Sequence, residues 1–168
     1  NAVLMHRRLA VIDVERGKQP MTYAVGEEVF TICYNGELYN TDELRNKLES
    51  RGYNFFSHSD TEVVLKAYCE YREKCVELFN GIFAFGVWEH ESKRLFLARD
   101  RMGVKPLFYS FCKNGIVFAS EIKSLLENPW VEAAIDINSL AEIMLIGPGR
   151  TPGYGVFKGV KEIKPAHC

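Results

Sequence analysis

Four apolar segments that follow one another closely constrain the fold of this chain most strongly. Residues 82–88 are almost wholly apolar, as expected for a strand that is covered on both faces. Residues 94–98 follow after a short polar turn, and residues 107–112 and 116–119 flank a Lys-Asn-Gly hairpin signal. Segments joined so closely predict an antiparallel meander.

Two amphipathic helices are predicted before these strands. Asn40 with Glu43 has the spacing of a capping box, Leu44 and Leu48 lie on one helical face, and Gly52 is placed to end this first helix. The sequence therefore predicts a helix that begins after residue 40 and ends before residue 52.

The second helix is predicted over about residues 61–71, with Ser59 and Glu62 as its capping box. A further helical turn is expected at 75–79, and shorter helices at 120–127 and 139–146.

Three further strands are expected at residues 8–13, 21–23 and 29–34, and the Gly- and Pro-rich sequence from residue 147 onward predicts a loop. Helices and antiparallel strands in this order indicate an α+β fold, with helices layered over antiparallel sheets.

Composition restricts the class of protein. The chain has 168 residues, of which 47% are apolar, and its formal net charge is −1. These values predict a folded domain with a substantial core and give no indication of a nucleic-acid partner. No run of eighteen apolar residues is present, so we expect no membrane association and a cytoplasmic location.

Cysteine and histidine usage argues against a disulfide framework and a metal site. The five cysteines are an odd number without a CxxC pair, which favours reduced thiols. The four histidines show no metal-ligand spacing, so no metal is expected.

The dipeptide Asn35-Gly36, at the end of an apolar run, allows two interpretations. Asn-Gly is the commonest two-residue hairpin turn, because both residues tolerate a positive φ. The alternative is a corner that presents an amide side chain and a bare backbone N–H at one point. Two such donors can stabilise the oxygen of a tetrahedral intermediate.

Four motifs occur in a fixed order along the chain. They are HRRLAVID with QPM (residues 6–13 and 19–21), YNGELYN (34–40), SDTEV (59–63) and ARDRMGVKPLFY (98–109). Their sequences and their order resemble those of glutamine-hydrolysing asparagine synthetases. The resemblance covers nearly the whole chain and implies the class II glutamine amidotransferase domain, a four-layer αββα fold of the N-terminal-nucleophile hydrolase type, here without its first strand or strands.

The resemblance assigns roles to individual residues. It implies that Asn35 and Gly36 form the oxyanion hole, that Arg8 holds the α-carboxylate of glutamine, and that carboxylates accept from its α-ammonium group. An arginine opposite a carboxylate pair is the charge pattern that an amino-acid head group requires. The full expected set of glutamine-binding residues is Arg8, Leu9, Ala10, Val11, Ile12, Asn35, Gly36, Glu37 and Asp60.

Three other residues are predicted to be structural. We interpret Asp100 and Arg101 as scaffold that holds the meander, despite their strong motif. Cys33 lies in an apolar strand, so we expect a packed thiol and not a nucleophile.

The family nucleophile is an N-terminal cysteine, and this chain begins with Asn1. We therefore expect residues 1–2 to be the remains of an expression tag, residues 3–146 to be an N-terminally truncated amidotransferase domain, and residues 147–168 to be a linker toward a synthetase domain. The chain alone should be inactive.

Glutamine and the synthetase domain are the expected partners, and ATP and Mg²⁺ are expected only in that domain. An open sheet edge would favour self-association, so a homodimer is an alternative to a monomer.

Other functions are left open by the sequence. The phosphoribosyl and fructose-6-phosphate amidotransferases carry His where this chain has Tyr34, which favours the asparagine branch. A β-lactam-forming relative, or a non-catalytic regulatory or dimerisation module, is also compatible with the motifs.

Overall fold

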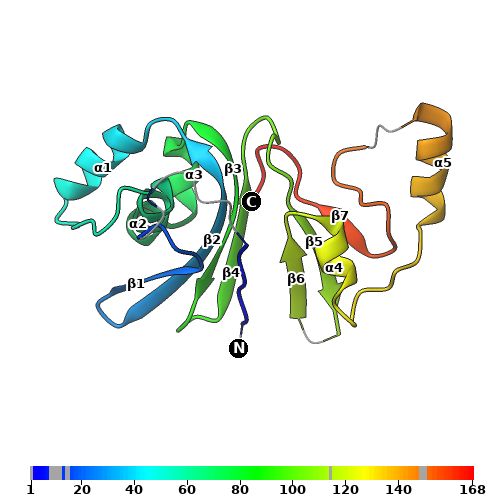
Figure 1. Cartoon of the computed structure of the whole chain (residues 1–168), viewed down its shortest axis with the longest axis horizontal. Helices are drawn as coiled ribbons and strands as arrows, with labels where there is room; N and C mark the ends of the chain where they lie inside the picture. The colour runs from blue at the N-terminus through cyan, green and yellow to red at the C-terminus, as the bar shows by residue number, and fades with distance from the viewer. Residues whose placement is uncertain (1, 8–12, 14–15, 114, 148–150) are drawn as a thin grey trace. The chain divides into compact units, whose positions relative to one another are not determined.

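Two compact units make up the chain, one comprising residues 1–98 with 168 and the other residues 99–167. The computed structural model describes residues 2–7, 13, 16–113, 115–147 and 151–168. Each unit is built around its own antiparallel sheet, with helices beside it (Figure 1). None of the described helices has the length and apolar character needed to cross a bilayer. The predicted α+β class is confirmed.

The first unit contains a four-stranded sheet with the order β1-β2-β3-β4. The strands are β1 (Met21–Val25), β2 (Glu28–Leu38), β3 (Gly81–Glu89) and β4 (Arg94–Arg99). β2 pairs antiparallel with both β1 and β3. The strands predicted around these positions are present, and β2 extends four residues beyond its predicted end.

Helices lie on one face of this sheet, as Figure 1 shows. They are α1 (Thr41–Glu49), α2 (Asp60–Tyr71), the 3₁₀ turn η1 (Arg72–Lys74) and α3 (Cys75–Leu78). Apolar side chains from alternate sheet positions fill the space beneath them, and they include Phe30, Ile32, Tyr34, Phe83, Phe85 and Val87. The opposite face of β2 carries Thr31, Cys33, Asn35 and Glu37.

Asn35 and Gly36 lie inside β2, paired with Ala84 and Phe83 of β3. The hairpin turn is therefore wrong, and so is a corner as the backbone geometry; the presentation of an amide side chain and a backbone N–H at one point stays a prediction. Glycine is required here by close strand approach, because a Cβ on Gly36 would lie 2.4 Å from Ile82 O. An Asn-Gly pair signals a turn only where the chain reverses, and here β2 continues to residue 38.

The helix predicted after residue 40 is confirmed, but its predicted capping box is wrong. The Asn40 side chain makes no bond to the α1 backbone. It donates to Leu78 O and accepts from Asn80 N, each at 3.0 Å, and so ties the end of β2 to the loop before β3. Gly52, with φ +94°, ends α1 as predicted.

The second helix begins as the sequence predicts. Ser59 is the N-cap of α2, and its hydroxyl accepts from Glu62 N at 3.4 Å. The side chain of Glu62 does not complete the reciprocal half of the box, because it bonds elsewhere in the core.

The second unit has a three-stranded sheet with the order β6-β5-β7. β5 (Phe108–Cys112) and β6 (Gly115–Ala119) form the predicted hairpin, and β7 (Val160–Glu162) pairs with the other edge of β5. The single meander is therefore wrong, since β3 and β4 belong to one sheet while β5 and β6 belong to another. Local spacing shows that strands are antiparallel but does not show which sheet each one joins.

The loop predicted from residue 147 contains β7, so it is not irregular throughout. A three-residue strand gives too short a pattern to be recognised among Gly and Pro residues. α4 (Ile122–Leu126) and α5 (Ile137–Ile146) complete this unit, and its core contains Phe108, Leu125, Val131 and Val160. The expected division into an amidotransferase domain and a linker stays a prediction.

Candidate active site

The expected site residues fall into two groups. Asn35, Gly36 and Glu37 lie in the last part of β2, and Asp60 is the first residue of α2. The remaining five lie outside the described residues, namely Arg8, Leu9, Ala10, Val11 and Ile12.

Backbone groups of β2 alternate in direction. His90 N donates to Val29 O at 2.9 Å and Tyr39 N donates to Asn80 O at 2.8 Å. In an antiparallel pair, hydrogen-bonded residue pairs alternate with non-hydrogen-bonded ones. Since Val29 and Tyr39 both bond the β3 side, the odd-numbered residues of β2 are the ones whose backbone groups bond β3. Even-numbered residues therefore point their N–H and C=O groups toward the edge where β1 lies.

β1 covers this edge only as far as the Met21–Ile32 pair. Beyond it the side chain of Gln19 takes the place of a strand. Its amide oxygen accepts from Tyr34 N at 2.6 Å and its amide nitrogen donates to Tyr34 O at 2.9 Å. The same nitrogen lies 3.2 Å from Thr61 Oγ1, so Gln19 also connects β2 to α2.

Asp60 occupies the same edge four residues further along. Its Oδ2 accepts from Leu38 N at 3.2 Å and from the Tyr34 hydroxyl at 3.0 Å, and its Oδ1 accepts from Thr61 N at 2.8 Å. The side chain is half-buried. A carboxylate with part of its surface accessible remains able to accept from a ligand.

Gly36 lies on this edge between Tyr34 and Leu38, whose N–H groups bond Gln19 and Asp60. Its N–H points away from β3, and within the described ranges no acceptor is found for it. The edge therefore presents one backbone donor, from Gly36, about 7 Å from the Leu38 N–H that holds Asp60, at 3.4 Å per residue.

Negative charge gathers around the buried hydroxyl of Tyr34. Burial raises the pKa of Tyr34, and the charges of Asp60 and then Glu37 raise it further. Both carboxylates therefore lie within electrostatic reach of one hydroxyl. Glu37 itself is exposed. That Asp60 and Glu37 together accept from an α-ammonium group stays a prediction.

Asn35 is half-buried, and the alternation along β2 places it on the sheet face opposite the helices. It is adjacent in the chain to the Gly36 N–H. An amide side chain and a backbone N–H at consecutive positions are a suitable pair of donors for one oxygen.

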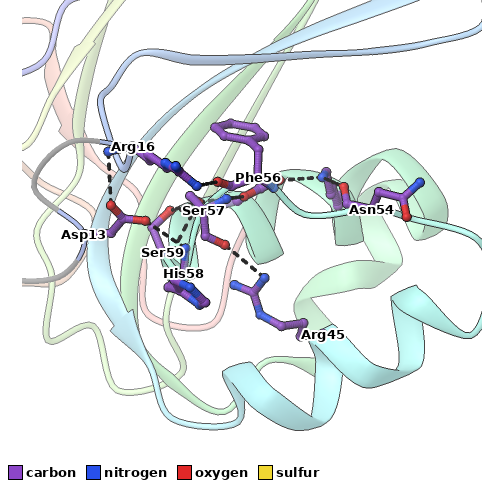
Figure 2. A network of polar contacts seen from close by, with 10 residues as sticks. Asp13, Arg16, Arg45, Asn54, Phe56, Ser57, His58 and Ser59 are labelled. Carbon is purple, nitrogen blue, oxygen red and sulfur yellow. Dashed lines mark hydrogen bonds and ion pairs between the residues drawn. The ribbon is translucent and has the colours of Figure 1, made fainter.

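The end of the first motif is attached to the loop before α2. Asp13 accepts from Arg16 N at 3.1 Å and from His58 N at 2.9 Å, and these bonds hold the pKa of its carboxyl below the ordinary value. Arg16 donates to Phe56 O at 3.4 Å. Figure 2 shows Asp13 and Arg16 bonded to this loop from one side, while Arg45 of α1 reaches Ser57 O.

Glu62 and Lys66 form a buried ion pair beneath the same loop, with Nζ and Oε1 2.5 Å apart and both side chains fully buried. Glu62 also accepts from Phe56 N, Ser57 N and Ser57 Oγ. Burial alone would raise the pKa of Glu62, but the Lys66 ammonium and the donors of the loop hold it below the ordinary value. This pair anchors the loop that leads into Asp60.

The thiol of Cys33 has the character expected of a packed side chain. Burial raises its pKa to about 11. The thiol donates to Met5 O at 3.7 Å. At neutral pH almost none of it is thiolate, so Cys33 is poorly suited to nucleophilic attack.

The fourth motif builds a scaffold in the second unit, as expected. Asp100, 1% exposed, accepts from Met102 N, Val104 N and Lys105 N, each at 3.0 Å. The buried ion pair here is Arg99–Glu162 at 2.9 Å. Arg101, which the sequence interpretation paired with Asp100 in this role, is exposed.

The sequence did not predict roles for Gln19, Tyr34 or Thr61. Each lies within a motif, and only the register of β1 against β2 shows that Gln19 faces Tyr34. The sequence shows only that each of these residues belongs to a motif and does not show what each one contacts.

Comparisons with known proteins show the family to which this chain belongs. The chain matches the family described as "Glutamine amidotransferase domain" over residues 1–168. It is 53% identical over 163 residues to asparagine synthetase 3 (glutamine-hydrolysing) of Bacillus subtilis strain 168, which covers 97% of this chain and 26% of that protein. Asparagine synthetase 1 of the same organism is 47% identical over 120 residues, or 71% of this chain and 19% of that protein.

Among solved structures, the glutamine phosphoribosylpyrophosphate amidotransferase of B. subtilis, complexed with ADP and GMP, has a similar fold. The TM-score is 0.56 with 24% identity, over 64% of this chain and 25% of that one. This likeness confirms the fold of N-terminal-nucleophile amidotransferases. The chain spans between about a fifth and a quarter of the length of these proteins. The match over its whole length shows that the chain belongs to the glutamine amidotransferase domain family.

Proposed function

We propose that this chain is the glutaminase domain of a glutamine-hydrolysing asparagine synthetase and binds L-glutamine along the open edge of β2. In the proposed reaction glutamine is hydrolysed to glutamate, and the ammonia serves the ATP-dependent conversion of aspartate to asparagine. That second step, with ATP and Mg²⁺, would belong to a synthetase part outside residues 1–168. The strongest sequence support is the identity to relatives of that name.

The head group of glutamine would lie at the Asp60 end of the edge. Asp60 and Glu37 supply acceptors for the three N–H groups of the α-ammonium, and their combined negative charge suits a cation. Arg8 remains the expected partner of the α-carboxylate, with residues 9–12 beside it.

The side-chain amide of glutamine would reach Gly36 and Asn35. Gly36 N–H and the Leu38 N–H beside Asp60 lie about 7 Å apart along the strand, which is the order of length of a glutamine side chain. When a thiolate adds to the amide carbon, the carbonyl oxygen becomes negative. Removing one donor to such an oxygen typically costs about 3–4 kcal/mol of transition-state stabilisation.

One observation carries this proposal. The backbone donor of Gly36, for which the described part of the chain supplies no acceptor, lies on the same strand edge as the carboxylate of Asp60, between two positions whose N–H groups are occupied. A donor and a carboxylate at this separation can bind the two ends of one extended amino acid.

The direct test is a titration of the chain with L-glutamine, followed by NMR or calorimetry. Asn35→Ala and Asp60→Asn should each weaken binding about tenfold or more. Asp136→Asn, at the N-cap of α5 in the second unit, is the matched control and should leave binding unchanged. Loss of binding in the control, or unchanged binding in both site variants, would contradict the proposal.

Hydrolysis is tested separately by ammonia release. Burial raises the pKa of Cys33 to about 11, that of Cys69 to about 12, and that of Cys75 as well. We therefore expect that none of these three thiols releases ammonia from bound glutamine. Rapid, glutamine-dependent ammonia production would show that a thiol of this chain is activated despite its surroundings.

A further inference from the structure

Tyr34 has an unusual position for a core tyrosine. Its ring is 3% exposed and packs on the helix-covered face of β2, while its hydroxyl leaves the apolar core to donate to Asp60 Oδ2 at 3.0 Å. Phenylalanine would fill the same core volume. The hydroxyl therefore needs an explanation beyond packing.

The acceptor capacity of Asp60 suggests one. An ionised carboxylate has about four acceptor positions. Oδ2 already accepts two bonds, from Tyr34 and Leu38, whereas Oδ1 accepts one, from Thr61 N. No second donor to Oδ1 is found among the described residues, so the remaining position is on that oxygen, and the carboxylate cannot rotate to exchange its oxygens without breaking both bonds to Oδ2.

Tyr34 is itself held from behind. The Gln19 amide bonds both the N–H and the C=O of Tyr34 and continues to Thr61, the residue next to Asp60. The two elements that meet at the Tyr34–Asp60 bond are thus fixed relative to each other within the first unit. A bond between elements held in this way has a defined direction.

We propose that Tyr34 is a positioning residue for substrate recognition, which holds Asp60 by Oδ2 so that Oδ1 faces the α-ammonium group of glutamine. This role rests on the proposed function. Tyr34 does not touch the substrate, and its effect passes through Asp60. It should therefore affect ligands that carry the ammonium group and leave others alone.

The alternative is that the bond only attaches α2 to β2. A structural tie of this kind would loosen the whole site when removed and would weaken every ligand. The two roles therefore differ in how the loss of the hydroxyl depends on the ligand.

The experiment compares Tyr34→Phe with the unchanged chain against two ligands, L-glutamine and 4-carbamoylbutanoate, which is glutamine without its amine. We expect the substitution to weaken glutamine binding about tenfold and to change binding of the deaminated ligand less than about twofold. In an Asp60→Asn background the same substitution should cause no further loss, because the carboxylate that it orients is gone.

Tyr68→Phe is the matched control. Tyr68, on α2, is also a buried tyrosine, and its hydroxyl donates to the Glu89 carboxylate at 2.5 Å. It lies about 12 Å from Asp60 along the helix, at 1.5 Å per residue. Tyr68→Phe should leave the ratio of the two ligand affinities unchanged.

The possible outcomes separate the role of Tyr34 from the proposed function. Equal losses for the two ligands, or an additive loss in the Asp60→Asn background, would overturn the role of Tyr34 while the proposed function stands. If the unchanged chain does not bind glutamine at all, the proposed function fails, and this role of Tyr34 fails with it.

Discussion

Asp60 and Asp100 both accept backbone N–H groups, but one lies at the proposed site and the other holds a loop together. Each is an aspartate in a strong motif, and each accepts at least two backbone N–H groups. Asp100 is buried and bonds residues two to five positions ahead, so it closes its own loop. Asp60 is half-buried and bonds two elements that lie 22 residues apart, through Leu38 N.

The difference shows that motif strength alone does not separate a scaffold from a site. A carboxylate that is enclosed by its own loop has no surface left for a ligand. A carboxylate at a strand edge keeps part of its surface accessible while two elements hold it in place. Exposure and the origin of the donors are therefore the informative quantities.

The largest expected effect concerns Glu62, which lies two residues from Asp60 but is enclosed as Asp100 is. Glu62→Gln leaves the Lys66 ammonium buried without its ion-pair partner, and should lower the free energy of unfolding by about 3–5 kcal/mol. Asp60→Asn should cost much less. Urea denaturation of both variants checks this, and equal losses would remove the distinction between enclosed and edge carboxylates.

The same pair gives a pH dependence. The folded-state pKa of Glu62 lies below its ordinary value of 4.5, so the folded state binds fewer protons than the unfolded state in acid. The stability that it contributes is complete above about pH 4.5 and is lost as the pH falls through the folded value. Glu62→Gln should flatten this acid limb of the stability curve.

Asp100→Ala should cause the next largest loss of stability. It removes the acceptor of three backbone N–H groups in a buried loop and should cost about 2–4 kcal/mol of unfolding free energy. Glutamine binding by the folded variant should persist. Asp60→Ala should show the reverse pattern, a small loss of stability with a large loss of glutamine affinity. Denaturation and a glutamine titration of each variant compare the two substitutions.

Gly36→Ala tests the strand edge. Its Cβ would meet the Ile82 carbonyl at 2.4 Å and Phe83 Cα at 2.8 Å, both backbone atoms that cannot turn aside. We expect a loss of about 1–3 kcal/mol, together with weaker glutamine binding as β2 and β3 separate. Normal stability and affinity would show that the two strands tolerate a side chain here.

The smallest effect is expected at Cys33. Cys33→Ala should change glutamine affinity by less than about twofold, because the thiol bonds Met5 O and has no expected contact with the ligand. A tenfold change would place this thiol in the site and would reopen its exclusion as a nucleophile.

Much of this architecture is predictable from local chemistry. Ser59 caps α2, Gly52 ends α1 and the 82–88 run is a strand, because capping, chain reversal and full burial leave clear signals over a few residues. The residues of the site were predicted from their resemblance to a family, and the structure shows four of them, Asn35, Gly36, Glu37 and Asp60, at the end of β2 and the start of α2.

The errors come from features that depend on distant partners. Asn40 has the sequence of a helix cap, yet its amide bonds Leu78 and Asn80, which lie about forty residues away. Gly36 resembles a turn, but the need for glycine comes from β3. Neither contact can be read from neighbouring residues, because each depends on the register of β2 against β3.

The side chain of Gln19 has a consequence for the behaviour of the protein in concentrated solution. An uncovered strand edge is a template on which extended segments of other molecules can add and begin aggregation. Among the residues that the structure describes, Gln19 fills both bonding positions of Tyr34 and so shortens the uncovered part of this edge of β2 to the vicinity of Gly36. That length suits a small amide and is too short to seed the growth of a sheet.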